Sequence, residues 1–208
     1  MRYLVLNSFF FLLIACFSPY KKLHKTLADP GCVQKFKPAF AFALYKTQVG
    51  VKGKQISGIL LIKTMPDSSI RMVFSNEMGF KFFDFEFSAR NGFTVYYIME
   101  QMNQEAVKKT LRKDFELVLL LHTEAGKAFA LKDGQHNYFA FPQEKGTNYY
   151  ITDSACTQLL RMEKASKRKP VVIAQMQDYR NGIPDTIGIS HKNFKFTIGL
   201  KRIENVTR

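Results

Sequence analysis

The residue types that carry out acid–base or metal chemistry are scattered along this sequence. Its four histidines lie far apart, at His24, His122, His136 and His191. Only His122 has an acidic residue close behind it, Glu124, and one such pair is too little for a metal site. Asp84 and Glu86 lie two residues apart, so a strand would place both carboxylates on one face, a spacing that suits acid–base catalysis. Solvent-facing charges opposite buried phenylalanines fit the same spacing, and we favour that interpretation.

Sequence motifs for catalysis are absent as well. The chain contains no G-x-G-x-x-G, P-loop, G-x-S-x-G or H-E-x-x-H. We therefore expect a protein that is not an enzyme and that uses no cofactor and no metal ion.

The start of the chain has the pattern of an export signal. Arg2 supplies a positive charge, and residues 3–14 form an apolar stretch that is too short to span a bilayer as a helix. The stretch ends in Leu13-Ile14-Ala15-Cys16, which resembles the lipobox of bacterial lipoproteins. The resemblance implies cleavage before Cys16 and acylation of that residue, which would anchor the chain in a membrane. An ordinary secretory signal that happens to contain a cysteine is the alternative.

The rest of the chain is long enough for one domain. We expect a signal peptide over residues 1–15, a lipidated tether over 16–38 and a folded domain over 39–208. Lysines in the tether, Lys21, Lys22 and Lys25, would lie near anionic headgroups if Cys16 is lipidated. A merely solvated linker explains them equally well.

Composition favours a β-rich fold and an anionic partner. Of the 208 residues, 46% are hydrophobic, with 20 phenylalanines and no tryptophan. Aromatic side chains suit pleated, half-buried surfaces. The net charge of +14 implies an anionic membrane surface or a nucleic acid. Export argues against nucleic acid, so we expect anionic membrane lipid as a partner.

Two cysteines remain once Cys16 is lipidated, Cys32 and Cys156. An oxidising envelope permits a disulfide between them. Two buried free thiols explain them about as well, because a large separation in sequence does not show that they meet.

Alternating and β-branched runs predict strands through most of the domain. We expect strands over 40–46, 54–64, 68–75, 81–87, 93–99, 127–131, 137–141, 147–152, 170–179, 185–190 and 194–203. Pairs such as Asn91-Gly92 and Asn181-Gly182 mark turns between them. No rhythm of alternating strands and helices occurs, which indicates an antiparallel sheet. A sheet of this length curls into an open or closed barrel.

Residues 103–121 have a helical period. One apolar stripe contains Val107, Leu111, Phe115, Val118 and Leu119. Asn103 is the predicted N-cap. We expect this helix to pack on the sheet, and a basic helix on a membrane surface is the alternative.

The segment Asn76-Glu77-Met78-Gly79 places a large apolar side chain at a turn, where polar residues are usual. With Phe80 and Phe82, Met78 forms a patch that we interpret as a membrane contact, although single exposed hydrophobes are common. Inward faces of the nearby strands would line a cavity for acyl chains, with Leu60, Ile62, Met72, Phe74, Phe83, Phe85, Val95 and Tyr97 as its wall. A filled core is the alternative.

These features resemble the LolB family of outer-membrane receptors, which accept lipoproteins from the periplasmic carrier LolA. The similarity lies in the order of a lipobox, a tether, Gly58-Ile59-Leu60, a strand over 70–74 and a loop with a protruding hydrophobe. The family's loop reads Asn-Pro-Leu-Gly, so Met78 falls at the exposed leucine and Glu77 replaces the proline. The C-terminal segments 183–184 and 196–200 also look like the family's closing strands.

The resemblance implies a mainly β (α+β) fold, a half-open antiparallel β-barrel with covering helices. It also implies a lipid-anchored outer-membrane protein that faces the periplasm. Such a protein takes acylated lipoproteins from a LolA-like carrier and inserts them into the membrane through residues 76–80. We expect it to act as a monomer. An envelope lipoprotein that uses the same barrel for a structural, assembly or other lipid-binding role is the alternative.

Overall fold

A computed structural model describes residues 18–166 and 169–203; the predicted signal peptide and Cys16 lie outside this part. The described residues form thirteen strands: β1 (His24–Thr26), β2 (Phe42–Val51), β3 (Lys54–Thr64), β4 (Ile70–Ser75), β5 (Lys81–Ser88), β6 (Gly92–Ile98), β7 (Phe129–Lys132), β8 (His136–Pro142), β9 (Thr147–Asp153), β10 (Leu159–Ala165), β11 (Pro170–Arg180), β12 (Ile183–His191) and β13 (Phe196–Arg202). They also form one α-helix, α1 (Glu105–Val118), and the 3₁₀ helices η1 (Pro19–Lys22), η2 (Pro30–Phe36), η3 (Glu100–Met102) and η4 (Ala125–Lys127).

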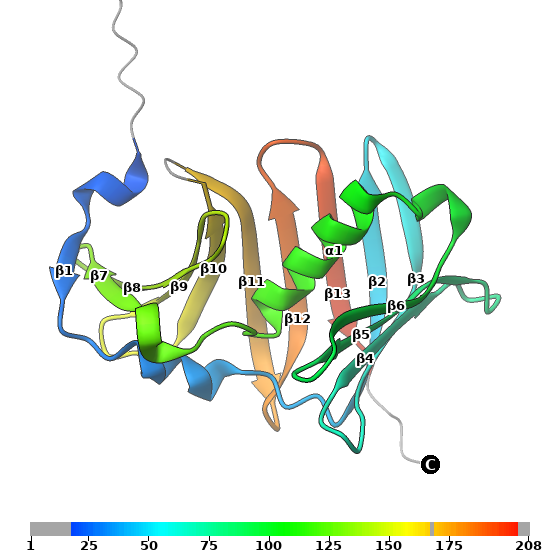
Figure 1. Cartoon of the computed structure of the whole chain (residues 1–208), viewed down its shortest axis with the longest axis horizontal. Helices are drawn as coiled ribbons and strands as arrows, with labels where there is room; N and C mark the ends of the chain where they lie inside the picture. The colour runs from blue at the N-terminus through cyan, green and yellow to red at the C-terminus, as the bar shows by residue number, and fades with distance from the viewer. Residues whose placement is uncertain (1–17, 167–168, 204–208) are drawn as a thin grey trace, which may run out of the picture.

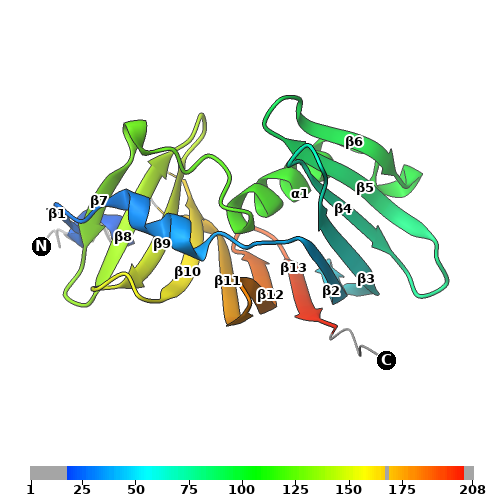
Figure 2. The ribbon, with the colours of Figure 1, turned by 90° about the horizontal axis from the view of Figure 1, so that it is seen from below.

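All thirteen strands belong to one antiparallel sheet. Their order is β1-β7-β8-β9-β10-β11-β12-β13-β2-β3-β4-β5-β6. The outermost strands β1 and β6 do not pair with each other, so the sheet curls into a trough without closing (Figures 1 and 2). The predicted mainly β, half-open antiparallel architecture is confirmed.

The helix α1 lies in the trough of the curled sheet (Figure 2). The Phe115 ring is 5.9 Å from that of Phe83 and 6.5 Å from that of Phe87, between ring centroids, and the helix also contacts β10 and β11. Its predicted apolar stripe therefore packs on the sheet. The predicted N-cap is wrong, because the residue before the first turn is Gln104, and its side chain makes no capping hydrogen bond.

The expected tether is part of the fold from residue 18 onward. The strand β1 pairs with β7, and Val33 in η2 is fully buried. On the outer face of β8–β10, the Tyr20 ring stacks on Tyr149 with a centroid distance of 4.4 Å. The sequence signal was weak here because β1 is only three residues long and polar. The strand β10 was also not predicted, because a register shift between Leu159 and Arg161 breaks its alternation.

No helix within residues 18–166 and 169–203 combines the length and the apolar character that crossing a bilayer requires.

Antiparallel pairing places alternate connections at the same rim of the sheet. One rim carries the turns 52–53, 143–146, 166–169 and 192–195 and the loop 76–80. We call it the basic rim, for reasons given below. The opposite rim carries the turns 65–69, 89–91, 133–135, 154–158 and 181–182. We call it the cleft rim.

Candidate functional site

The loop 76–80, between β4 and β5, is held by its own hydrogen bonds. The Asn76 side-chain oxygen accepts from the backbone N–H groups of Met78, at 3.0 Å, and Phe80, at 2.8 Å. The Asn76 N–H donates to the Phe80 carbonyl at 2.9 Å, and the Gly79 N–H donates to the Asn76 carbonyl at 3.1 Å. Gly79 has φ +86°, a conformation that glycine adopts without strain. The backbone therefore fixes the direction in which the loop presents its side chains.

This loop exposes two large apolar side chains. Met78 is 81% exposed and Phe80 is 67% exposed, at the tip of a hairpin that projects from the sheet (Figure 1). Phe82 differs from the prediction: it lies at an irregularity in the β4–β5 pairing, where its ring stacks 4.8 Å from that of Phe74. The exposed patch therefore consists of Met78 and Phe80 without Phe82.

Close packing behind the loop depends on Gly58 of β3. A Cβ atom at this position would collide with the Ser75 carbonyl oxygen and press against the Phe74 ring. The glycine thus lets the end of β4 approach β3, where Ile59 pairs with Ser75. It supports the start of the loop.

The predicted cavity wall is mostly packed against other side chains. Six of its residues are at most 3% exposed and belong to the main core: Leu60, Ile62, Met72, Phe74, Phe83 and Phe85. The same core contains Leu111, Phe115 and Val118 of α1. Helix α1 therefore covers this wall, and the filled-core alternative describes these six positions.

Tyr97 does not belong to the wall. The pairing of β5 and β6 shifts between Asp84 and Phe85, so that Tyr97 pairs with Asp84 on the outer face of the sheet. The ring is 45% exposed, with the Lys81 ammonium 5.7 Å from its centroid. Val95 pairs with Phe85 and packs against the core, as predicted. Strict alternation missed the bulge and assigned Tyr97 to the wrong face.

An open cleft of about 930 Å³ lies at the cleft rim, at the far end of β4 and β5 from the loop. Its apolar lining includes Phe40, Ile70, Phe87, Phe93, Leu120 and Leu121. A volume of roughly 300–1,000 Å³ is typical of small-molecule sites. The cleft is bounded by residues 37–41, by the turns 65–69 and 89–91, and by the segment that follows α1.

The lining of this cleft also carries charge. The buried carboxylate of Glu116 lies 2.7 Å from Nε of Arg112, 2.8 Å from Nζ of Lys113 and 3.6 Å from Nε2 of His122. Burial raises the pKa of Glu116, but hydrogen bonds from Lys113 and Arg112 outweigh it and hold this pKa below its usual value. Arg112 also lies 5.6 Å from the centroid of the Phe93 ring. The cleft thus joins an apolar wall to fixed charge, which suits an amphiphilic ligand.

Most of this cleft has no signal in the sequence. Residues 37–41 and 120–124 come together only through the fold, and they were predicted as a tether, the start of a strand and a helix end. Leu120 and His122 have φ of +50° and +59°, and the chain turns sharply there after α1. The one signal of this turn in the sequence is that the helical period of the apolar residues ends there.

The acidic pair Asp84 and Glu86 lies on one face, as the spacing predicts, but both residues are buried rather than solvent-facing. Asp84 accepts from Arg71 Nε at 2.6 Å and from Lys81 Nζ at 3.0 Å. Burial raises the pKa of Asp84, but these two partners outweigh that effect and leave this pKa below its usual value. The Arg71 guanidinium stacks 3.9 Å from the Tyr96 ring centroid. Asp84 is therefore part of an ion-pair network outside the trough, and Glu86 beside it accepts from the Tyr96 hydroxyl at 3.4 Å.

A disulfide joins Cys32 in η2 to Cys156 in the turn 154–158, across 124 residues of sequence. This decides between the two alternatives that the sequence left open. The bridge fastens the segment before β2 to the cleft rim.

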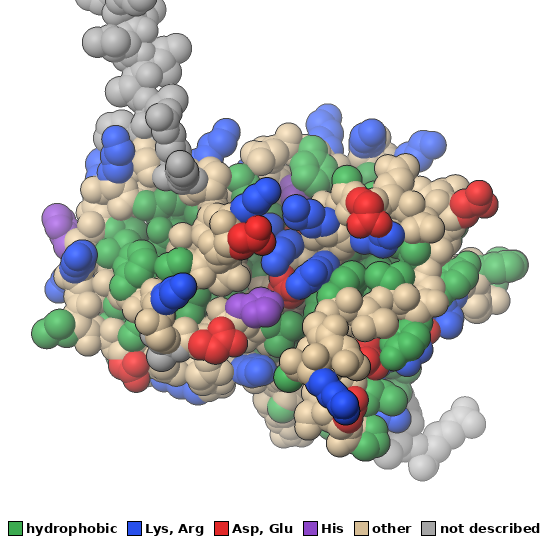
Figure 3. Space-filling view, in the orientation of Figure 1, with side chains coloured by type: hydrophobic (Ala, Val, Ile, Leu, Met, Phe, Trp, Pro, Cys, Tyr) green, Lys and Arg blue, Asp and Glu red, His purple; other side chains and the backbone are tan. Residues whose placement is uncertain are grey.

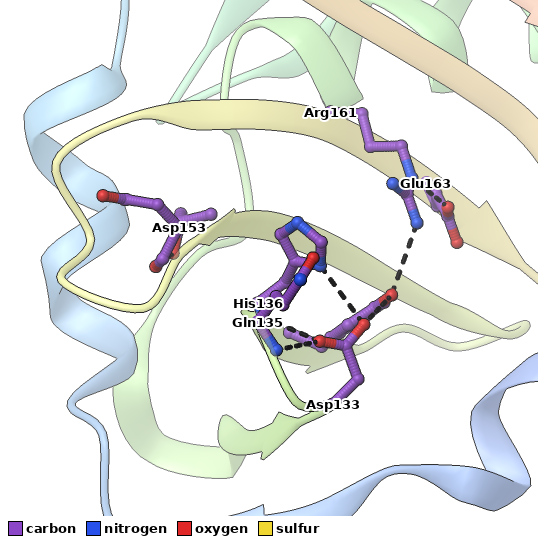
Figure 4. A network of polar contacts seen from close by, with 8 residues as sticks. Asp133, Gln135, His136, Asp153, Arg161 and Glu163 are labelled. Carbon is purple, nitrogen blue, oxygen red and sulfur yellow. Dashed lines mark hydrogen bonds and ion pairs between the residues drawn. The ribbon is translucent and has the colours of Figure 1, made fainter.

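A second group of titratable side chains forms a polar network around β8–β10 (Figure 4). Asp133 accepts from the N–H groups of Gln135 and His136, at 2.8 Å and 2.7 Å, and from the Tyr138 hydroxyl at 3.1 Å. Burial raises the pKa of Asp133, but these hydrogen bonds outweigh it and lower this pKa to about 2. The network builds the β7–β8 turn.

His191 is buried, with its Nε2 2.8 Å from Asp114 Oδ2 on α1, and this contact ties the helix to the sheet. Burial raises the pKa of Asp114, an effect that His191 partly offsets. Within residues 18–166 and 169–203, no three His, Cys, Asp or Glu side chains are grouped so that they could hold a metal ion.

Comparisons with known proteins agree with this fold. No protein-family model matches the chain, and no curated protein sequence matches it. A crystal structure of a domain from Vibrio parahaemolyticus, assigned to outer membrane lipoprotein sorting, is similar with a TM-score of 0.51 at 8% identity, over 86% of this chain and 93% of that one. A DUF1329 family protein from Desulfovibrio piger is similar with a TM-score of 0.44 at 9% identity, over 85% and 90%. At such identity, the likeness to the Vibrio domain shows a shared fold alone.

Proposed function

We propose that this chain is an outer-membrane-anchored lipoprotein, facing the periplasm, that binds the acyl chains of other lipoproteins and inserts them into that membrane. One observation carries the proposal: the loop 76–80 holds Met78 and Phe80 exposed on a hydrogen-bonded turn at the rim of a half-open barrel. Apolar side chains presented in this way can enter the headgroup–acyl boundary of a bilayer. The fold shared with a lipoprotein-sorting domain and the predicted lipobox at Cys16 support the same function.

The cargo would first enter the cleft rather than the wall predicted from the sequence. Phe87, Phe93 and Leu121 offer an apolar surface. A hydrocarbon chain that covers these side chains leaves none of their atoms without a hydrogen-bond partner, because they have no polar side-chain atoms. The Arg112–Glu116 pair in the same lining would contact the polar part of the cargo. A LolA-like carrier would deliver this cargo at the cleft rim.

Transfer then requires a route between the two ends of β4. The inner face of this strand carries Ile70, Met72 and Phe74 in a row from the cleft to the loop. Side chains of α1 cover this row. We therefore infer that α1 must shift to let an acyl chain pass beneath it toward Met78.

The test compares Met78→Glu with Met78→Leu. The chain is loaded with a fluorescent acylated peptide, and release into liposomes is followed over time. The glutamate variant is expected to slow release about tenfold, because a charge opposes entry into the bilayer, while the leucine variant releases normally. Both should melt like the wild type, because the side chain is 81% exposed. Unchanged release by Met78→Glu would remove the loop from the mechanism.

The packed wall favours a second candidate function. Because Phe83 and Phe85 are covered by α1, the barrel could serve as a solid module that holds a protein partner in the envelope. This candidate predicts that the purified chain carries no lipid, whereas acyl transfer predicts a bound acyl chain.

A further inference from the structure

The β12–β13 turn (192–195) and the β2–β3 turn (52–53) form a continuous surface on the basic rim. Phe196 pairs with Val51 where the two hairpins meet, and the Lys52 N–H donates to the Lys195 carbonyl at 3.0 Å. A cleft of about 560 Å³ lies between them and is lined by residues of both turns. The hydrogen bond and the strand pairing fix the two turns relative to each other.

This surface carries positive charge that the fold does not use. Lys52, Lys54, Lys192 and Lys195 are all exposed. None of them forms an ion pair with a side chain in the described part of the chain. No acidic residue occurs in either turn. Lysine is a strongly hydrated point charge that suits phosphate groups.

A third turn adds to the same charge. The β10–β11 turn (166–169) lies on the basic rim, two strands from the β12–β13 turn, and contains exposed Lys169. In Figure 3, Lys and Arg side chains follow the upper rim of the molecule, over the hairpins β2–β3 and β12–β13.

An aromatic side chain stands among these lysines. Phe194 is 49% exposed at the tip of the β12–β13 turn, between Lys192 and Lys195. Its ring lies 4.6 Å from that of His191 and 5.9 Å from that of Phe196, so its base rests on buried rings. An exposed ring flanked by lysines is typical of residues at a membrane interface, where the ring enters the headgroup layer and the ammonium groups meet phosphates.

We propose that the lysines of these two turns, with Phe194, form a binding surface for the phosphate headgroups of anionic phospholipids. The loop 76–80 is another connection at this end of the strands, and Figure 1 shows the β4–β5 hairpin at the right-hand edge of the molecule, below the two upper turns. The inference goes beyond the proposed function, because headgroup binding needs no acyl cargo.

The first test measures binding to vesicles by sedimentation. The full chain carries Cys16→Ser, which removes the predicted lipidation site. It is expected to bind vesicles of phosphatidylcholine mixed with phosphatidylglycerol, less tightly as salt rises, and not vesicles of phosphatidylcholine alone. Lys192→Gln/Lys195→Gln should weaken binding roughly 25-fold, at about fivefold for each lysine near the surface.

The matched control removes the same charge from the cleft rim. Lys63 and Lys132 are exposed there, next to the turns 65–69 and 133–135, and neither has an ion-pair partner among the described residues. Lys63→Gln/Lys132→Gln should weaken binding no more than about twofold. An equal loss of vesicle affinity in the two double variants would overturn the proposal. Tighter binding of the full chain to DNA than to the mixed vesicles, lost in Lys192→Gln/Lys195→Gln, would also overturn it.

The second test uses the absence of tryptophan from the chain. Phe194→Trp introduces a single reporter, whose emission should shift to the blue on mixed vesicles. The control is Phe42→Trp. Phe42 lies at the start of β2 on the opposite rim and is 43% exposed, and the emission of a tryptophan there should not shift. An unshifted reporter at 194 contradicts the proposal. Met78→Glu should retain headgroup binding even where it blocks cargo release, which separates this surface from the transfer mechanism.

Discussion

The two rims of the sheet use charged side chains for different purposes. At the cleft rim, Asp67, Asp133 and Asp153 each accept backbone N–H groups of their own turns. At the basic rim, the lysines of the β2–β3 and β12–β13 turns pair with no acidic side chain in the described residues. These carboxylates therefore hold the turns of the cleft rim together, whereas the lysines of the β2–β3 and β12–β13 turns are available to a partner outside the fold.

Function and stability therefore depend on different rims of this molecule. Replacing the exposed lysines of the β2–β3 and β12–β13 turns should change membrane binding and leave the free energy of unfolding unchanged within about 0.5 kcal/mol. Variants of the cleft-rim carboxylates or of the disulfide should change stability first.

Removing the disulfide should have the largest effect on stability. The bridge between Cys32 and Cys156 spans 124 residues, so its loss frees a long loop in the unfolded chain. Replacing both cysteines with serine is expected to lower the free energy of unfolding by about 2–5 kcal/mol, measured by urea denaturation. Lys192→Gln/Lys195→Gln serves as the control and should unfold like the wild type. A double serine variant as stable as the wild type would show that the bridge does not hold the cleft rim.

Gly79→Ala tests whether the loop 76–80 is held rigid. Because Gly79 has φ +86°, a Cβ atom there strains the backbone and is expected to cost about 1 kcal/mol. Its thermal midpoint should fall, and cargo release should slow because Met78 is no longer held in place. Gly134→Ala is the control, because Gly134 lies in a turn with open space around its Cα and no positive φ. Normal release by Gly79→Ala would show that the loop needs no fixed shape.

Asp133→Asn should lower stability modestly at neutral pH, and this difference from the wild type should disappear in acid. The pKa of Asp133 is lowered from 3.8 to about 2 in the folded chain, so its carboxylate stabilises the fold above pH 4. That contribution is lost as the pH falls from about 4 to 2. Since the side chain is 36% exposed, we expect on the order of 1 kcal/mol. The variant should lose less stability than the wild type between these two pH values; parallel curves would contradict the assignment.

Periodicity predicted those parts of the fold whose signal is local. The alternation in β4 and β5 identified Met72, Phe74, Phe83 and Phe85 as inward-facing, and each is buried there. It failed at Tyr97, because one extra residue in β6 reverses the face of every residue beyond it. Tertiary contacts decide such bulges, and alternation alone does not reveal them.

The candidate site was predictable at the loop and not at the cleft. Asn76, Met78 and Gly79 lie within four residues of one another in sequence, and their types indicate a tight turn with an exposed hydrophobe. The cleft joins residues 37–41 to 120–124, which are distant in sequence and have no shared pattern. Whether inward-facing residues line a cavity or a filled core depends on where α1 packs, which the helical stripe alone does not specify.

Native mass spectrometry of the chain, released gently from membranes, tests most directly whether this half-barrel carries an acyl chain. The proposed function predicts a species heavier than the protein by one acylated molecule. It also predicts that Leu121→Lys loses this species, because the substitution places a charge on the apolar wall of the cleft. A spectrum with only the bare chain, identical for both proteins, would contradict acyl binding and favour a module for a protein partner.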